Sequence, residues 1–348
     1  MRRRSDRGIA LLLALLLLAL LIVLILQMGV TSLHNRTASD NQLADLQNTY
    51  GTRSGYHQAL LYLQRDSEQP SKVDSVNELW ASPIEFDLAR AHVRVAIEDS
   101  DRFINLSRLT NDKGEANPTV AAQLRRLVRF LRHDPDAAER ILDYVDADTK
   151  GNFEQHARNE RLFNIEELLR VEGLTPEVLY GGMINGEEKK GIIGFVTIWP
   201  REPAPSGPAQ GPEGPPPPGS PVNVNTAPAE VLVSLSDRMT IGLAEEIVRM
   251  RSLPGTGSSF QEFQSAEELK KVHGMDAETY ESLAGQVAVQ SSTFEIKVRS
   301  RVGNVEKAWV HVVRRGSGEK GQAELLGSQR VNDFLSVRPP ETAETQSR

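Results

Sequence analysis

An uncharged, almost purely apolar run from Ile9 to Leu26 constrains this chain more than any other feature of its sequence. A helix rises about 1.5 Å per residue, so the run spans about 27 Å, close to the hydrocarbon thickness of a bilayer. Arginines at positions 2, 3, 4 and 7 precede it, and the positive-inside rule then places the N-terminus in the cytoplasm. A cleavable secretory signal fits less well, because its apolar core is about 7–15 residues long and ends at a small-residue site. The run predicts a single-pass membrane anchor.

The remaining composition excludes several classes of protein. The chain has 348 residues, enough for two or three compact units, and its net charge of −7 argues against a body built to bind nucleic acid. It has no cysteine, which excludes disulfides, zinc–thiolate sites and thiol nucleophiles. Its seven histidines form no His-Glu-x-x-His pair, and no nucleophile elbow, phosphate loop or dinucleotide fingerprint is present. We therefore expect that the protein is not an enzyme.

Beyond the anchor, the helical pattern continues without a proline until Pro70. Apolar side chains recur there at near-helical spacing, with polar residues between them. They are Leu33, Leu43, Leu46, Tyr50, Leu60, Leu61 and Leu63. We expect one helix that crosses the membrane and then lines the back of a globular domain. A separate short helix after the anchor is the alternative.

Strand patterns come in separated pieces. Val93, Val95 and Ile97 alternate with polar or small residues, and so do Phe294, Ile296 and Val298 further along. The pattern returns at residues 305–313 after a Gly-Asn turn at 303–304, and residues 191–199 (GIIGFVTIW) form a β-rich apolar run. These pieces predict an antiparallel sheet packed on the long helix and interrupted by helical insertions.

The insertions contain a repeat. Residues 164–180 (NIEELLRVEGLTPEVLY) align with residues 265–281 (SAEELKKVHGMDAETYE). Each copy opens at a capping residue, Asn164 or Ser265, and each first helix is expected to end at a glycine, Gly173 or Gly274. A second helix follows in each copy, and upstream the tetrapeptide INLS (residues 104–107) is echoed by VNVN (residues 222–225). The repeat predicts a duplicated module of the helix-hairpin-helix type.

The start of the apolar run resembles the type III signal of type IV pilins and pseudopilins, a short basic leader that ends in glycine before an apolar helix. The matching residues are Arg7, Gly8 and Ile9. The resemblance implies that a prepilin peptidase cuts between Gly8 and Ile9 and that the new amino group of Ile9 is methylated. Most pilins carry glutamate at the fifth mature residue, where this chain has Leu13. In that family the carboxylate pairs with the N-terminal amine of a neighbouring subunit, and its absence is typical of the K-type subunit, which has no subunit above it.

The order of motifs resembles the K-type minor pseudopilin of type II secretion systems (the general secretion pathway protein K family) over roughly residues 5–315. The motifs are INLS, a helical stretch, LDYVDAD, FNIEELLRVEGLTPEVL, FVTIWP, VNVNTAPAEVL and EELKKVHGM. The resemblance implies an α+β, pilin-like fold, in which a long N-terminal helix packs on an antiparallel sheet, with a large inserted helical domain of helix-hairpin-helix-like units. The chain departs from the family at residues 200–221, a proline-rich segment that we expect to be a solvated linker.

The same resemblance implies a function and a set of partners. The protein would form the tip of the type II secretion pseudopilus and help to initiate its assembly for export of folded proteins across the outer membrane. Its partners would be the minor pseudopilins of the I and J types, the major pseudopilin filament and the prepilin peptidase, with no nucleic acid among them. It would cross the bacterial inner membrane once, with the N-terminus in the cytoplasm and the bulk in the periplasm.

The expected segments follow from these patterns. They are a leader (1–8), an anchor and filament-core helix (9–30), a pilin-like helix with the first strands (31–104), a first inserted unit (105–190), a strand (191–199), a proline-rich linker (200–221), a second helix-hairpin-helix-like unit (222–286), C-terminal strands (287–330) and a tail (331–348).

One group of carboxylates is a candidate metal site. Asp146 and Asp148 lie in LDYVDADTKGNFE with Glu154 nearby, and calcium takes oxygen ligands in adaptable geometry. The resemblance adds that family members hold calcium in the helical insertion. Lys150, however, occupies the third ligand position of a standard calcium loop. No cofactor is expected to be required, so the alternatives are a structural Ca²⁺ and ordinary solvated carboxylates.

Two other functions stay open. A competence-type membrane DNA receptor also joins an anchor to tandem helix-hairpin-helix units, and VNVNTAPAEVL resembles the start of that domain. DNA-binding hairpins need a Gly-x-Gly turn that presents backbone amides to phosphate, but the turns here place Asp237 and Asp276 at that point, beside only Lys270 and Lys271. The second alternative is a minor pilin of a type IV pilus, which would have the same kind of apolar membrane anchor. The inserted module and Leu13 favour secretion.

Overall fold

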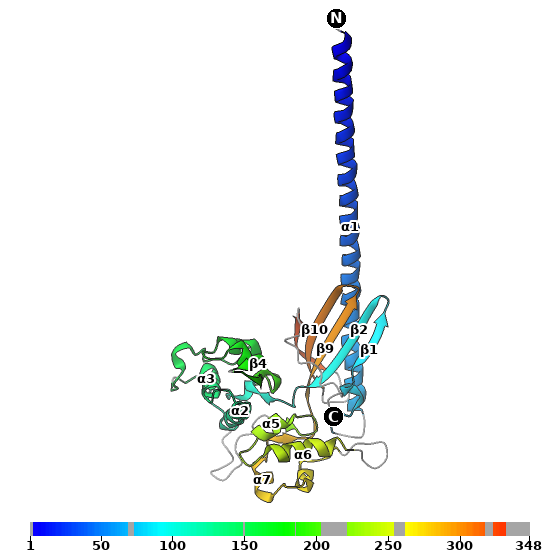
Figure 1. The fold of residues 1–348 in the computed structure, drawn as a ribbon. Helices are drawn as coiled ribbons and strands as arrows, with labels where there is room; N and C mark the ends of the chain where they lie inside the picture. Colours follow the sequence, from blue (N-terminus) through cyan, green and yellow to red (C-terminus); the bar gives the residue numbers. More distant parts are fainter. Residues whose placement is uncertain are drawn as a thin grey trace.

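One long helix, α1(Arg3–Ser67), stands out from a head that gathers around its C-terminal end (Figure 1). The computed structural model describes residues 3–68, 73–148, 150–184, 186–202, 221–253, 262–316 and 323–331. No proline interrupts α1, so its backbone hydrogen bonds continue from the apolar run into the head. The predicted continuous helix is confirmed, and the alternative of a separate short helix after the anchor is wrong.

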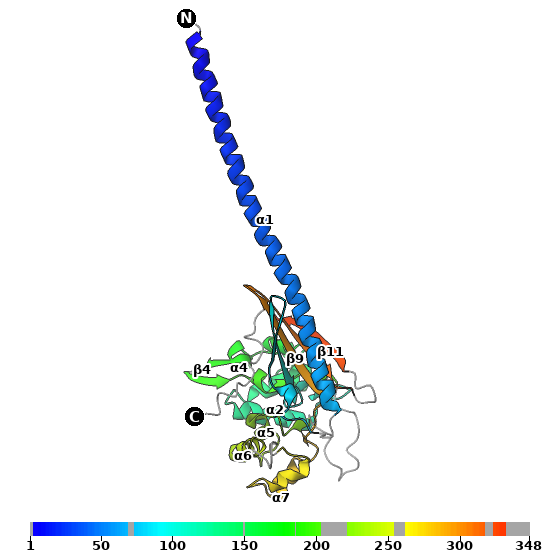
Figure 2. The same ribbon diagram turned by 90° about the vertical axis from the view of Figure 1, so that its right-hand side faces the viewer.

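A five-stranded antiparallel sheet lies against the C-terminal part of α1 (Figures 1 and 2). In spatial order the strands are β1(Ile84–Leu88), β2(Ala91–Asp99), β9(Thr293–Val302), β10(Val305–Arg314) and β11(Glu324–Val331). β2 and β9 are hydrogen-bonded neighbours, with Val95 opposite Val298, although the whole insertion separates them in the sequence. The predicted alternation at Val93, Val95 and Ile97 places these side chains in the core. The antiparallel sheet on a long helix is confirmed.

α1 packs on this sheet through small residues. Ala59 is fully buried, and a Cβ added at Gly55 would lie 2.6 Å from Cγ1 of Val298, so the helix lies too close to the strands for larger side chains. Leu63 is buried and Leu60 half-buried. The other apolar residues that indicated the helix stay 47% to 67% exposed, namely Leu33, Leu43, Leu46, Tyr50 and Leu61. Their spacing predicted that the helix continues but not which of its sides faces the sheet.

The connection from β2 to β9 forms the inserted domain, which lies beside and below the sheet in Figures 1 and 2. A short turn, η1(Leu79–Ala81), precedes β1. The inserted elements are β3(Ile104–Asn105), η2(Leu106–Arg108), α2(Pro118–Phe130), α3(Asp136–Val145), η3(Glu154–His156), η4(Ile165–Arg170), α4(Pro176–Tyr180), β4(Gly181–Ile184), β5(Glu187–Lys190), η5(Ile192–Gly194), β6(Val196–Thr197), β7(Val222–Asn223), α5(Ala229–Ser234), α6(Ile241–Arg251), η6(Ala266–Lys271), α7(Ala277–Ser282) and β8(Val287–Ala288).

The insertion consists of two units with the same closure. The first opens at β3 and closes at β6, where Ile104 pairs in parallel with Val196. The second opens at β7 and closes at β8, where Val222 pairs in parallel with Val287. The units share one hydrophobic core, in which α2 packs against α5. The predicted duplication therefore produces one body rather than two independent ones.

The repeated helices are shorter than the sequence indicated. The first helix of each copy is a six-residue 3₁₀ segment, η4 or η6, rather than an α-helix. Gly173 and Gly274 follow these segments with φ of 84° and 89°, as their predicted role in ending a helix requires. Asn164 caps η4 through its side chain, whereas Ser265 makes no such cap on η6.

Two strand assignments need correction. Of residues 191–199, only the two residues of β6 form a strand, and they pair in parallel with β3 instead of joining the sheet. The apolar character of this run reflects burial in the insertion core, where Ile192 and Phe195 are buried. Residues 287–288, expected among the C-terminal strands, are β8 of the second unit. The hairpin of β4 and β5 was not predicted, and most of the proline-rich segment and of the tail lies outside the described residues.

Candidate functional site

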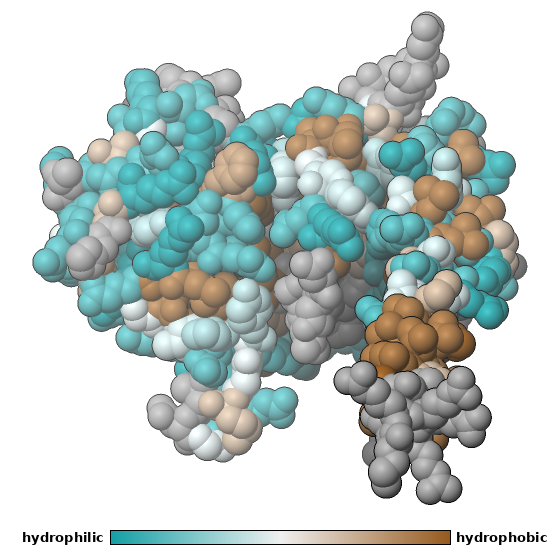
Figure 3. All heavy atoms as spheres, turned by 90° about the horizontal axis from the view of Figure 1, so that it is seen from above, coloured by the Kyte–Doolittle hydropathy of each residue, from teal (hydrophilic) through white to brown (hydrophobic). Residues whose placement is uncertain are grey.

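The N-terminal half of α1 is the part of the chain most clearly built for contact with something else. Ile9 and Leu13 are 56% and 57% exposed, and none of the most apolar stretch of this helix is covered by the head. Among the described residues, α1 is the one helix long and apolar enough to cross a membrane. Figure 3 shows its apolar side chains standing out from a mostly hydrophilic head. The bond between Gly8 and Ile9 lies within the helix, and the structure does not otherwise test the predicted cleavage.

The three candidate metal ligands, which lie within one short stretch of the sequence, come together in the first inserted unit. Asp146 caps the C-terminal end of α3, Asp148 follows in the turn, and Glu154 opens η3. One carboxylate oxygen from each lies within 4.8 Å of the others. In the described part of the chain, Oδ1 of Asp146 and both carboxylate oxygens of Glu154 are buried and accept no hydrogen bond. Buried acceptors without donors are costly unless a cation or a proton compensates them.

The electrostatics of this cluster follow from the burial of like charges. Burial, followed by the charges of Asp148, Glu154 and Asp143, raises the pKa of Asp146 to about 6. Burial and the neighbouring carboxylates of Asp143 and Asp148 also raise the pKa of Glu154. No ion pair among the described residues involves Asp146, Asp148 or Glu154. A bound cation would relieve this repulsion.

The surrounding loop is shaped closely around the cluster. The amide of Phe153 donates to Oδ2 of Asp143 at 3.0 Å, and the amide of Lys150 donates to Oδ1 of Asp148 at 2.7 Å. A side chain at Gly151 would collide with the carboxylate of Asp143, so only glycine fits where the loop passes it. Lys150 thus contributes its backbone and not a ligand. Carboxylate oxygens in a flexible loop suit Ca²⁺, and the residues present fit that ion.

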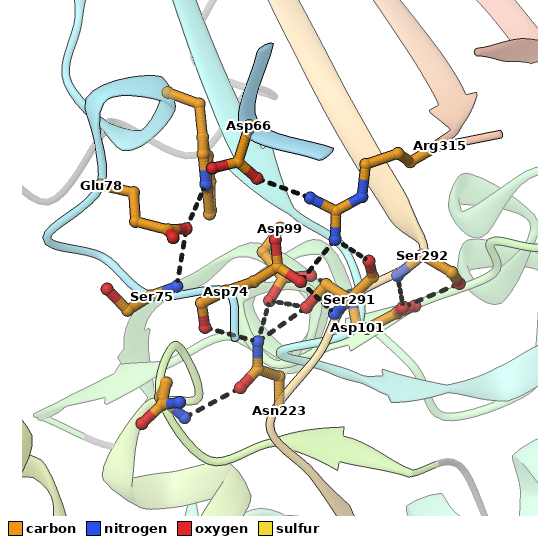
Figure 4. A network of polar contacts seen from close by, with 12 residues as sticks. Asp66, Asp74, Ser75, Glu78, Asp99, Asp101, Asn223, Ser291, Ser292 and Arg315 are labelled. Carbon is orange, nitrogen blue, oxygen red and sulfur yellow. Dashed lines mark hydrogen bonds and ion pairs between the residues drawn. The ribbon is translucent and has the colours of Figure 1, made fainter. Parts of the chain in front are cut away.

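A second polar centre was missed from the sequence. It lies at the neck, where the insertion leaves and re-enters the sheet (Figure 4). We define the neck as residues 99–101 and 291–293 together with the charged groups beside them, Asp66, Asp74, Glu78 and Arg315. Asp99 is buried and accepts hydrogen bonds from Ser291 Oγ at 2.6 Å and Thr226 Oγ1 at 2.5 Å. Arg315 binds Asp66 at 2.6 Å and Asp74 at 2.5 Å. These residues come from distant segments, so no local motif marks them; the acidic run EDSD at residues 98–101 was the one visible signal.

The hairpin turns of the second unit are poorly suited to phosphate binding. Asp237 in the first turn accepts from Arg126, and Arg238 pairs with Glu278 at 2.6 Å. The amide of Arg238 already donates to Oγ of Ser236. Backbone amides and basic groups that a phosphate would need are therefore engaged within the protein. In the second turn the basic residues are engaged likewise, Lys271 with Glu268 and Lys270 over the ring of Tyr280.

Together, the helix, sheet and insertion define an α+β, pilin-like fold that carries a pair of helix-hairpin-helix-like units between two neighbouring strands. A model of the helix-hairpin-helix motif matches residues 218–288, the second unit. A chain in the crystal structure of the GspK-GspI-GspJ complex from the type 2 secretion system of enterotoxigenic Escherichia coli has the same fold, with a TM-score of 0.61. The match covers 86% of this chain and 100% of that chain at 16% identity. No curated protein sequence matches significantly.

Proposed function

We propose that this chain is a minor pseudopilin that forms the tip of a type II secretion pseudopilus and helps to initiate its assembly. The observation that carries the proposal is the combination of an uncovered apolar helix with a pilin-like sheet and a large insertion, shared in fold with a chain of the GspK-GspI-GspJ complex. By that likeness, its partners are minor pseudopilins of the I and J types and the major pseudopilin filament. The role is structural rather than enzymatic.

Assembly begins in the bacterial inner membrane in this proposal. The arginine-rich leader holds the N-terminus in the cytoplasm, the head enters the periplasm, and a prepilin peptidase cuts between Gly8 and Ile9 before methylation of Ile9. The freed helix then packs with the helices of its partners. Exposure of Ile9 and Leu13 supports this step, because the head leaves these side chains uncovered and so free for van der Waals packing against partner helices.

Two features support a position at the tip, namely the uncharged residue at position 13 and the size of the insertion. A carboxylate at the position of Leu13 would need an amine from a subunit above it, because an unpaired charge in an apolar filament core is strongly unfavourable. A subunit at the tip has no such neighbour, so leucine is the better residue there. The insertion also widens the head beside the sheet, which suits a terminal subunit better than one enclosed between others (Figure 1).

For the cluster of Asp146, Asp148 and Glu154 we propose a structural Ca²⁺. The support is three converging carboxylates whose buried oxygens lack donors. The ion would join the end of α3 to η3 and so stiffen the first unit. No substrate chemistry is assigned to it.

The test of the proposed function is processing in bacteria that carry a prepilin peptidase and a type II secretion system. Mass spectrometry of the membrane-bound protein should find a chain that begins at methylated Ile9, and replacement of Gly8 by isoleucine should abolish this product. Gly29→Ala, in the same helix and with open space around the added Cβ, is the matched control and should be processed normally. Deletion of the gene should stop exoprotein release into the medium. Retention of the leader on the wild-type chain, in cells that process other pilins, would contradict the proposal.

A further inference from the structure

The neck contains more buried negative charge than its basic groups balance. Carboxylate oxygens of Asp66, Asp74 and Glu78 lie within 4.8 Å of one another. The side chains of Asp66 and Asp74 are 10% and 2% exposed, and Arg315 binds both of them. Glu78 accepts from Trp80 Nε1 at 2.6 Å and from the amide of Ser75 at 3.1 Å, and Arg315, which binds the other two carboxylates, also interacts with its charge.

Charged groups reach the neck from several elements packed around it. These are Asp66 of α1, Asp74 and Glu78 of the segment after α1, Asp99 and Asp101 at the end of β2, Arg108 of η2, Glu262 before η6, and Arg315 after β10. Carboxyl groups outnumber guanidinium groups in this set. Like charges crowded in a poorly hydrated site cannot all ionise at once, so the cluster must retain protons at a pH where isolated carboxyls have lost theirs.

Three of these carboxyl groups have pKa values well above those of isolated carboxyls. Burial, and then the charge of Asp74, raises the pKa of Asp66 to about 6. Burial, and then the charge of Asp66, raises the pKa of Glu78 to about 7. At the centre of the neck, burial and the charge of Asp101 raise the pKa of Asp99 to about 7. Three carboxyl groups that titrate near neutrality thus lie between the sheet and the insertion.

Hydrogen bonds around the carboxyl cluster join the segment after α1 to the second unit. Asn223, at the start of the second unit, donates to the backbone oxygen of Asp74 at 3.0 Å and to Oγ of Ser291 at 2.7 Å. The amide of Ser291 donates to Oδ2 of Asp74 at 2.7 Å. Asp74 therefore joins the segment after α1 to both the entry and the exit of the second unit. A change in charge at this cluster acts on the attachment of the insertion to the helix and sheet.

We propose that the neck is a proton-operated coupling, in which protonation of the carboxyl cluster fixes the insertion to the helix and sheet and loss of these protons loosens it. The direction of this pH dependence follows from the linkage between proton binding and folding. A carboxyl whose pKa is higher in the folded than in the unfolded protein binds its proton more tightly when folded, so its contribution is greatest at low pH and falls as pH rises from about 4 to about 7. The coupling uses only residues of this chain and acts in whatever filament the protein joins.

Trp80 provides the measurement, because it is 2% exposed, donates to Glu78 and packs edge-on against Phe294 at 5.1 Å between ring centres. In the full-length protein in nonionic detergent, replacement of Trp199 and Trp309 by phenylalanine leaves Trp80 as the sole emitter. Its fluorescence should titrate with a midpoint between about pH 6 and about pH 7. The melting temperature followed by Trp80 should fall by about 3 °C or more between about pH 5 and about pH 8.

The variant Glu78→Gln distinguishes this coupling from a purely structural polar contact. Glutamine can still accept from Trp80 and Ser75, so the variant should melt like wild type at low pH, melt higher than wild type at about pH 8, and lose about a third of the pH dependence, the share of one of the three carboxyl groups. Glu188→Gln, an exposed carboxylate on β5, is the matched control and should keep the wild-type profile. A flat wild-type profile, or a Glu78→Gln profile identical to wild type, would overturn the proposal.

Discussion

The close approach of α1 to the sheet leads to a quantitative prediction for Gly55→Ala. The added Cβ would lie 2.6 Å from Cγ1 of Val298, 2.9 Å from Cγ2 of Val95 and 3.1 Å from Cγ1 of Val93. All three valines are fully buried, and their branched side chains have little freedom to rotate away. Overpacking costs about 1–3 kcal/mol, and three close contacts with stiff side chains place the cost here at about 2–3 kcal/mol, whereas alanine returns about 1 kcal/mol through its higher helix propensity. We expect a net loss of about 1–2 kcal/mol.

The assay is thermal unfolding of the full-length protein in detergent, followed by the fluorescence of Trp80, which lies in the same helix–sheet core. For a protein of this size a loss of 1–2 kcal/mol should lower the melting temperature by about 2–8 °C. Gly29→Ala is the control, because no atom lies within 4 Å of its added Cβ, and it should melt as wild type does. A Gly55→Ala protein that melts at or above the wild-type temperature would refute the close-packing argument.

Three further predictions follow from the anchor, the carboxylate cluster and the hairpin turns. Leu13→Glu should impair exoprotein secretion, since a tip subunit has no amine above it to pair with the carboxylate; secretion at the wild-type level would count against the tip assignment. Calcium at about 100 times its dissociation constant should stabilise the protein by about 2.7 kcal/mol in calorimetry, and Asp146→Asn should remove the effect. The stabilisation should shrink below about pH 6, because the raised pKa of Asp146 leaves this ligand protonated there. Duplex DNA should show no electrophoretic shift at physiological salt, whereas nanomolar, salt-sensitive binding would favour the DNA-receptor alternative.

Much of this fold was predictable from local sequence patterns, such as strand alternation and turn glycines. The alternation around Val95 and Ile296 identified two central strands, and the glycines at 173 and 274 identified two turns that need positive φ. These features are local, since a strand or a turn is encoded by residues within a few positions of one another. The three carboxylates of the candidate calcium site are local in the same sense, all within one short stretch after α3, and the structure does bring them together.

Features that depend on partners distant in the sequence were not predictable in this way. The face of α1 that meets the sheet is set by how closely two surfaces pack, and there Ala59 succeeds where leucine would not fit. The apolar run 191–199 carries no sign of whether its burial is in a sheet or in a helical core, and only Val196 and Thr197 became strand. At the neck, Asp66 and Arg315 are ion-paired from opposite ends of the chain, and no spacing rule connects them.

The two duplicated units begin with the same asparagine turn, but the asparagine makes different further contacts in each. Asn105 and Asn223 occupy equivalent positions, and each accepts a hydrogen bond at 2.9 Å from the amide two residues later, Ser107 or Asn225. Their other contacts differ, because Asn105 donates to the backbone of Pro200 whereas Asn223 donates into the neck. Through Asn223 the second unit is hydrogen-bonded to the helix and sheet at the neck. The first unit shares its core, carries the carboxylate cluster and meets the sheet elsewhere, where Trp199 packs on Gly327 of β11 and Glu202 pairs with Arg314.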